Sequence, residues 1–202
     1  MEITAVNIQK NNKNKCNIFI DGEYKFSASL SIVIKHKIKV GNILSQTGLD
    51  EILNEESFEQ ALTLSLRYIS KALKTKRQIY NYLIKKSFSP DCAYKVIDRL
   101  KELNYINDVE YAKRYAEYSF KKEGKRLTDF KLMQKGIKKT DIEAARDNLN
   151  VDTMQTAKML AEKRLKNKEI TKELLAKTFR YLVSKGFSYE EVENAIKTYG
   201  ED

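Results

Sequence analysis

Residues 86–100 read Lys86-Ser87-Phe88-Ser89-Pro90-Asp91-Cys92-Ala93-Tyr94-Lys95-Val96-Ile97-Asp98-Arg99-Leu100, and two later segments of the chain follow the same pattern. The second copy opens at Lys135-Gly136-Ile137 and the third at Lys185-Gly186-Phe187, at offsets of 49 and 50 residues. In each copy a lysine, a small residue and a large apolar residue precede a new amphipathic helix. A repeat of this length predicts tandem units of about three helices each.

The apolar positions within the copies have helical spacing. They fall at 93, 96, 97 and 100 in the first copy and at 192, 195, 196 and 199 in the third. Gly136 and Gly186 stand where the preceding helix should end in the left-handed conformation that glycine adopts at little cost. Ser87 occupies this position in the first copy, where we expect slight strain.

The N-terminal segment has a different character and predicts a small β-rich cap with one short helix. Asp21-Gly22 is a preferred pair for a two-residue hairpin turn, and apolar residues alternate on both sides of it. Residues 3–9 predict a first strand, joined to the hairpin through a polar loop at 10–15. Apolar residues at 30, 33, 34 and 38 then predict a short helix that ends at Val40-Gly41.

Capping signals divide the rest of the chain. Ser57-Phe58-Glu59-Gln60 and Thr75-Lys76-Arg77-Gln78 have the pattern of capping boxes, and Ser89-Pro90 marks a third helix start. The fold predicted is mainly α, with three tandem three-helix repeats in an elongated curved array behind a cap that contains a β-hairpin. The predicted domains are 1–55 for the cap and 56–106, 107–150 and 151–202 for the repeats.

The helix starts in the second and third repeats differ in strength. Asn107, Asp152 and Ser188 are good N-caps. Lys138 stands where Ser89 and Ser188 stand in the other copies, and lysine is a poor cap. The last helix of the second repeat could therefore begin two residues later, at Thr140.

Composition indicates a helix-rich soluble protein with an anionic partner. The 202 residues contain one proline and carry a net charge of +10, which favours nucleic acid or a nucleoprotein. No apolar run approaches the roughly 20 residues of a membrane span, and no leader is evident, so a cytoplasmic location is expected. Cys16 and Cys92 form no CxxC motif and are expected to be reduced thiols.

The sequence predicts no active site, cofactor or metal. His36, the only histidine, lies between two lysines and is expected to be exposed and inert. Metalloprotease, Cys/His zinc and phosphate-loop motifs are absent from the sequence. Helix capping explains the pair Asn107-Asp108 better than a metal site does.

Positive charge gathers in the first two helices of each repeat. Residues 67–86 hold seven basic residues and no acid, residues 113–126 six basic and two acidic, and residues 158–177 seven basic and three acidic. The predicted third helices have net charges of 0, −1 and −2. A helix–turn–helix protein needs a neutral or basic last helix in the major groove, so Glu190, Glu191 and Glu193 argue against that class.

A basic stripe that recurs along the repeats suits a long periodic polyanion. An ordinary solvated lysine-rich surface is the alternative, although twenty residues without an acid are unusual for one. Five tyrosines lie near the basic runs and could stack on bases, but a position at the edge of the core is favoured for them: Tyr80, Tyr82, Tyr111, Tyr115 and Tyr118.

The first repeat also resembles a known family, the RecX recombination regulators. The resemblance rests on Ala61, Tyr68-Ile69-Ser70, Thr75, Gln78-Ile79, Tyr82-Leu83, Phe88, Val96-Ile97, Leu100, Leu103, Tyr105-Ile106-Asn107-Asp108 and Tyr111-Ala112, and it continues through the two Lys-Gly turns to about residue 200. Asn107 replaces an aspartate that many relatives carry, and Ser87 replaces a glycine. Both departures are local capping choices.

The resemblance implies a non-enzymatic monomer that binds the RecA recombinase on single-stranded DNA. It implies that the protein lodges in the filament groove and inhibits ATP hydrolysis, strand exchange and repressor cleavage, with weak duplex DNA binding left open. Two other classes remain open: a helix–turn–helix regulator that binds duplex DNA directly, and a helical scaffold. The candidate filament-binding residues are Arg67, Lys71, Lys74, Lys76, Arg77, Arg114, Lys121, Lys122, Lys125, Arg126, Lys163, Arg164 and Lys168.

Overall fold

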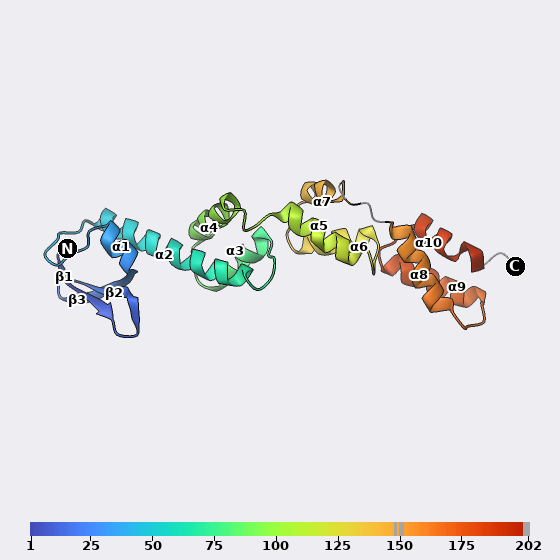
Figure 1. The fold of residues 1–202 in the computed structure, drawn as a ribbon, viewed down its shortest axis with the longest axis horizontal. Coiled ribbons are helices and arrows are strands. Elements are labelled where there is room, and N and C mark those ends of the chain that lie inside the picture. Colours follow the sequence, from blue (N-terminus) through green and yellow to red (C-terminus); the bar gives the residue numbers. More distant parts are fainter. Residues whose placement is uncertain (148, 150–151, 200–202) are drawn as a thin grey trace. The chain divides into compact units, whose positions relative to one another are not determined.

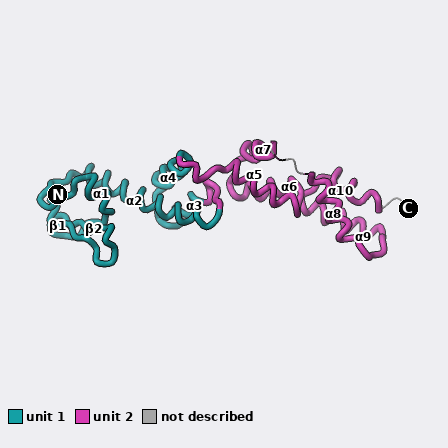
Figure 2. Tube along the Cα trace, in the orientation of Figure 1, with its two compact units in different colours: residues 1–72, 79–102 teal, residues 73–78, 103–202 magenta. Residues whose placement is uncertain are grey.

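The structure, a computed structural model, describes residues 1–147, 149 and 152–199. It contains two compact units, coloured in Figure 2, which are residues 1–72 with 79–102 and residues 73–78 with 103–202. A small sheet opens the chain and helices make up the rest (Figure 1). The elements are β1 (Ile3–Gln9), β2 (Asn12–Ile20), β3 (Glu23–Ser29), α1 (Leu30–Lys35), α2 (Gln46–Ile69), α3 (Lys76–Lys85), α4 (Pro90–Glu102), α5 (Asp108–Ser119), α6 (Lys125–Gln134), α7 (Lys139–Arg146), α8 (Thr153–Leu165), α9 (Lys172–Ser184), α10 (Tyr189–Ile196) and a 3₁₀ turn (Lys197–Tyr199).

The cap is an antiparallel sheet of order β1-β2-β3. The predicted hairpin is confirmed, because Asp21 and Gly22 have φ values of 50° and 85° and Ile20 pairs with Glu23 across the turn. The predicted polar loop at 10–15 is wrong. β2 begins at Asn12, which leaves only two residues for the turn after β1.

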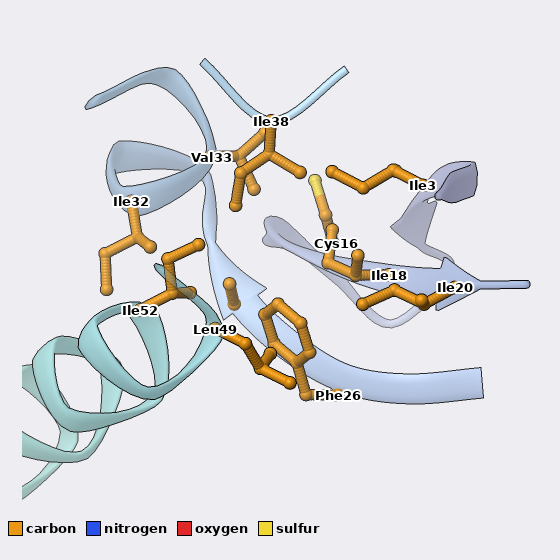
Figure 3. Close-up of a cluster of buried hydrophobic side chains, with 11 residues drawn as sticks. Ile3, Cys16, Ile18, Ile20, Phe26, Ile32, Val33, Ile38, Leu49 and Ile52 are labelled. Carbon is orange, nitrogen blue, oxygen red and sulfur yellow. The ribbon is translucent and has the colours of Figure 1, made fainter. Parts of the chain in front are cut away.

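One face of this sheet forms the core of the cap. Cys16 and Ile18 from β2 are buried with Ile32 from α1 and Ile52 from α2, as Figure 3 shows. α1 is shorter than predicted and ends at Lys35, since Lys37 adopts a φ of 50° and turns the chain so that Ile38 returns to the core.

α2 is longer than predicted. It starts after Ser45, whose side chain accepts a hydrogen bond from the Gly48 N–H, and continues through the predicted boundary at 55/56. The capping box predicted at Ser57 is therefore wrong. Ser57 is helical, and its hydroxyl donates instead to the Cys92 Sγ at 3.6 Å.

The later helix starts agree with the sequence more closely. Thr75 and Gln78 form the predicted capping box, and Ser188 forms one with Glu191. Ser89 accepts a hydrogen bond from the Cys92 N–H at 3.2 Å. α7 begins at Lys139 with Lys138 as an N-cap that makes no side-chain hydrogen bond, so the alternative start at Thr140 is not adopted.

The second helix of every repeat ends in the same turn. Ser87, Gly136 and Gly186 have φ values of 65°, 85° and 85°. In the first turn the Phe88 N–H donates to the Leu83 carbonyl and the Ser87 N–H to the Ile84 carbonyl, and the two later turns have the equivalent bonds. The predicted left-handed position, including the strained serine, is confirmed.

Candidate nucleic-acid interface

Contacts within residues 73–78 and 103–202 form a joint that fixes the start of α3. The Thr75 hydroxyl donates to the Lys135 carbonyl at 2.7 Å, and the buried Asp108 carboxylate accepts from the Lys76 N–H at 3.0 Å. Arg77 packs directly on Gly136, where an added Cβ would lie 2.2 Å from the Arg77 Cδ. All of these residues belong to the same compact unit.

The second and third repeats meet through a joint of the same kind. The Gly124 N–H donates to the Lys185 carbonyl at 2.9 Å, and the Arg126 N–H donates to the Gly186 carbonyl at 3.1 Å. A Cβ on Gly186 would lie 2.3 Å from the Leu127 nitrogen. Two features therefore require glycine at positions 136 and 186: the positive φ of the backbone, and the close approach of a residue from the neighbouring repeat.

The joints place cations at equivalent positions. Lys76 and Arg77 open α3, and Lys125 and Arg126 open α6, 49 residues further along the chain. Lys76 is half-buried and the other three are exposed. Cations at a helix N-terminus are unfavourable for the helix itself because they meet the positive end of its dipole. Their recurrence is therefore not explained by helix stability.

The candidate cations differ from the cations of the third helices in whether they form ion pairs with acidic side chains. In the described part of the chain, eight of the candidate residues have neither an ion pair with an acidic side chain nor a contact with a tyrosine ring: Arg67, Lys71, Lys76, Arg77, Lys121, Lys125, Lys163 and Lys168. On α4, by contrast, Lys95 pairs with Asp91, Arg99 with Glu102 and Lys101 with Asp98, all within 2.9 Å. The third-helix cations are locally neutralised, and most of the candidate cations are not.

The remaining candidates have other neighbours. Arg114 pairs with Glu110 at 2.6 Å, and Lys74 is half-buried. Lys122 donates to the Tyr118 hydroxyl, while the guanidinium carbons of Arg126 and Arg164 lie 5.9 and 4.6 Å from tyrosine ring centroids. The structure thus makes Arg114 a weaker candidate than the sequence suggested.

The loop between α5 and α6 presents only positive charge to solvent. Its one acid, Glu123, is 7% exposed and forms an ion pair with Lys131 of α6. The Thr128 hydroxyl also donates to Glu123, at 3.4 Å. The net charge counted from the sequence therefore understates the exposed positive charge of this loop.

Four of the five tyrosines near the basic runs lie at the edge of the core, as favoured. Tyr82 stacks on Tyr68 with centroids 4.3 Å apart, and Tyr80 is half-buried beside Tyr94. Two more contact the core of the second repeat, namely Tyr111 and Tyr115. The fifth, Tyr118, is 62% exposed.

His36 differs from the prediction. Its side chain is 23% exposed rather than open to solvent, and its Nε2 lies 2.8 Å from Glu55. Hydrogen bonds from Lys35 and His36 hold the pKa of Glu55 below its ordinary value. The flanking lysines suggested full exposure, but α2 supplies a carboxylate that the local sequence does not reveal.

The described residues contain no group of three or more His, Cys, Asp or Glu side chains that could hold a metal ion. None of the helices among them is both long and apolar enough to cross a bilayer.

Three segments of the chain match models of domains in one family. Residues 1–45 match the regulatory protein RecX N-terminal domain, residues 61–100 the RecX first three-helix domain, and residues 151–196 the RecX third three-helix domain. The chain is 31% identical over 201 residues to "Regulatory protein RecX" of Clostridium botulinum (strain Eklund 17B / Type B), covering 97% of this chain and 95% of that protein. It is 32% identical over 200 residues to the protein of that name from Clostridium tetani (strain Massachusetts / E88), covering 96% and 93%. A solved structure described as "Crystal structure of regulatory protein RecX" superimposes with a TM-score of 0.75 at 26% identity and covers 98% of each chain.

Proposed function

Because this chain belongs to the RecX family of regulatory proteins, we propose that it binds the filament that RecA forms on single-stranded DNA. It lies in the helical groove of the filament as a monomer, and it inhibits ATP hydrolysis, strand exchange and repressor cleavage without catalysing a reaction itself. The repeats 56–106, 107–150 and 151–202 each contribute a group of cations.

The observation that carries this proposal is the recurrence of cations without ion-pair partners at the repeat joints. Lys76 and Lys125 each open the second helix of a repeat, and among the described residues neither side-chain ammonium group is in an ion pair with a carboxylate. Phosphates would pair with these side-chain ammonium groups, because the backbone N–H groups of Lys76 and Arg126 are already bonded to Asp108 and to the Gly186 carbonyl. A ligand with regularly spaced phosphates can meet several such sites at once.

The pairing pattern also favours this function over direct duplex recognition. A helix–turn–helix protein would use the third helix of a repeat in the major groove. The cations of α4 are held by their own helix, and α10 starts with the acids Glu190 and Glu191. Neither helix presents free positive charge to a groove.

RecA ATPase on single-stranded DNA, with and without this protein, tests the proposal. We expect inhibition that saturates at a fixed ratio of protein to RecA and weakens as salt rises, because phosphate contacts are screened. ATPase that is unchanged at a several-fold excess would contradict it. A sequence-selective footprint on duplex DNA in the absence of RecA would favour the helix–turn–helix alternative.

A further inference from the structure

Two exposed tyrosines flank the cationic loop between α5 and α6. Tyr118 lies on the last turn of α5 and is 62% exposed, and Tyr189 opens α10 and is 57% exposed. The Lys122 Nζ lies 4.1 Å from the centroid of the Tyr118 ring, and the Arg126 guanidinium carbon lies 5.9 Å from the centroid of Tyr189. Each end of the loop therefore pairs an open ring with a cation.

Local contacts hold both rings in place. Lys122 donates a hydrogen bond to the Tyr118 hydroxyl, which lowers the pKa of that tyrosine. Tyr189 stacks on Phe179 with centroids 5.7 Å apart and planes at 28°. Because these contacts hold the rings and leave both residues more than half exposed, a planar ligand would find them already oriented.

The surroundings of the Tyr118 ring specify the charge of that ligand. Lys121 and Lys125 are exposed and in no ion pair within the described residues, and Glu123 is turned inward onto Lys131. Beside Tyr189, the acids Glu190 and Glu191 line one pocket with Lys125 and Arg126. Lys122 and Arg126 are four residues apart in the chain, so their Cα atoms lie at most about 14 Å from each other. A planar ligand with phosphates fits this combination.

We propose that Tyr118 and Tyr189 stack on unpaired nucleobases and make this surface selective for single-stranded over duplex nucleic acid. In a duplex the faces of the bases are covered by their neighbours and only the edges are open, whereas a single strand offers bare faces to aromatic side chains. The inference rests on the proposed function, because it assigns the base-contacting residues of the same basic surface. Phosphate contacts alone would not distinguish the two forms in this way.

The chain contains no tryptophan, so the fluorescence of a single introduced Trp reports on the surroundings of that one position. Full-length Tyr118→Trp and Tyr189→Trp would be titrated with an oligo(dT) single strand and with a duplex of equal length. Tyr105→Trp is the matched control, because Tyr105 is 54% exposed and has no cation over its ring among the described residues. Anisotropy of a label on the DNA would measure binding in the same samples.

Stacking predicts that the saturating single strand quenches the tryptophan emission of the Tyr118→Trp and Tyr189→Trp variants, that the duplex does not, and that the control changes little with either. Binding of the single strand without quenching in these two variants would overturn this inference and leave the proposed function intact. Absence of any DNA binding by anisotropy would overturn both.

Substitution of Tyr118 by residues other than tryptophan provides a second test, in which the affinities for single-stranded and duplex DNA are compared. Tyr118→Ala is expected to weaken single-strand binding about tenfold and duplex binding by less than about twofold, while Tyr118→Phe keeps the preference because it keeps the ring. An equal loss for both DNA forms in Tyr118→Ala would contradict the assignment of Tyr118 to base stacking.

Discussion

Arg77 lies on Gly136 so closely that a Cβ at residue 136 would overlap its side chain, at 2.2 Å from the Cδ and 2.4 Å from the Cβ of Arg77. Leu127 lies on Gly186 in the same way. Ser87, at the equivalent turn of the first repeat, is exposed. The difference between serine and glycine in the three copies thus follows from which turns receive a neighbouring repeat.

The first prediction separates close approach from backbone strain. Gly136→Ala should destabilise the protein by about 2–4 kcal/mol, because it adds a steric overlap to the left-handed strain of about 1 kcal/mol. Gly41→Ala is the matched control, since Gly41 has the same φ of 85° and nothing within 4 Å of an added Cβ. Urea unfolding would measure both, and equal losses would show that Arg77 does not fill the space above residue 136.

The second prediction concerns Asp108, which is 4% exposed and accepts a hydrogen bond from the Lys76 N–H. Asp108→Ala should reduce the free energy of unfolding by about 1–3 kcal/mol, because it leaves a backbone donor of the joint without its partner. Asp108→Asn retains an acceptor oxygen and should retain most of the stability. If the two variants unfold at the same urea concentration, the hydrogen bond to α3 does not stabilise the joint.

The third prediction is a pH dependence at Glu56, which ties the cap to α2. Burial raises the pKa of this carboxyl, but hydrogen bonds from Lys15, Gln60 and the Ser29 N–H outweigh it and the pKa lies below its ordinary 4.5. The carboxylate therefore stabilises the folded state fully above about pH 4.5, and this contribution is lost as the pH falls through the folded-state pKa.

Glu56→Gln should accordingly lose about 2 kcal/mol at pH 7 and much less at an acidic pH below the folded-state pKa, where the wild type is itself protonated. Glu51→Gln, an exposed acid on the same helix, is the control and should unfold as the wild type does at both pH values. Urea unfolding at the two pH values checks this. A loss at Glu56 that does not depend on pH would contradict the role of its charge.

Helix starts and turns were largely predictable because their signals are local. The left-handed turns, the hairpin at Asp21-Gly22 and the caps at Thr75 and Ser188 each depend on a few adjacent residues. The exception is Ser57, where the same local pattern lies inside α2. A capping box is only one use of a serine and a glutamine three residues apart, and here Gln60 donates instead to Glu56.

The candidate site was predictable only as a set of charges. Which cations lack ion-pair partners depends on contacts between segments far apart in the sequence, such as the ion pair of Lys15 with Glu56. Tyr189 was missed because its partner Arg126 lies 63 residues earlier in the chain. Counting acids and bases along the sequence cannot show that Glu123 is turned inward, since burial is a property of the folded repeat.

We propose that the joint cations without ion-pair partners, and not the paired cations, contact phosphates in the filament. The most direct test is the salt dependence of binding to RecA-coated single-stranded DNA for two triple variants. Replacing Lys76, Lys121 and Lys125 together by Gln should lower the slope of log K against log salt by about two, at roughly 0.7 per phosphate contact on a single strand. Replacing Lys95, Arg99 and Lys101 of α4 by Gln should leave the slope as in the wild type. An unchanged slope in the first variant, or an equal fall in both, would contradict the account.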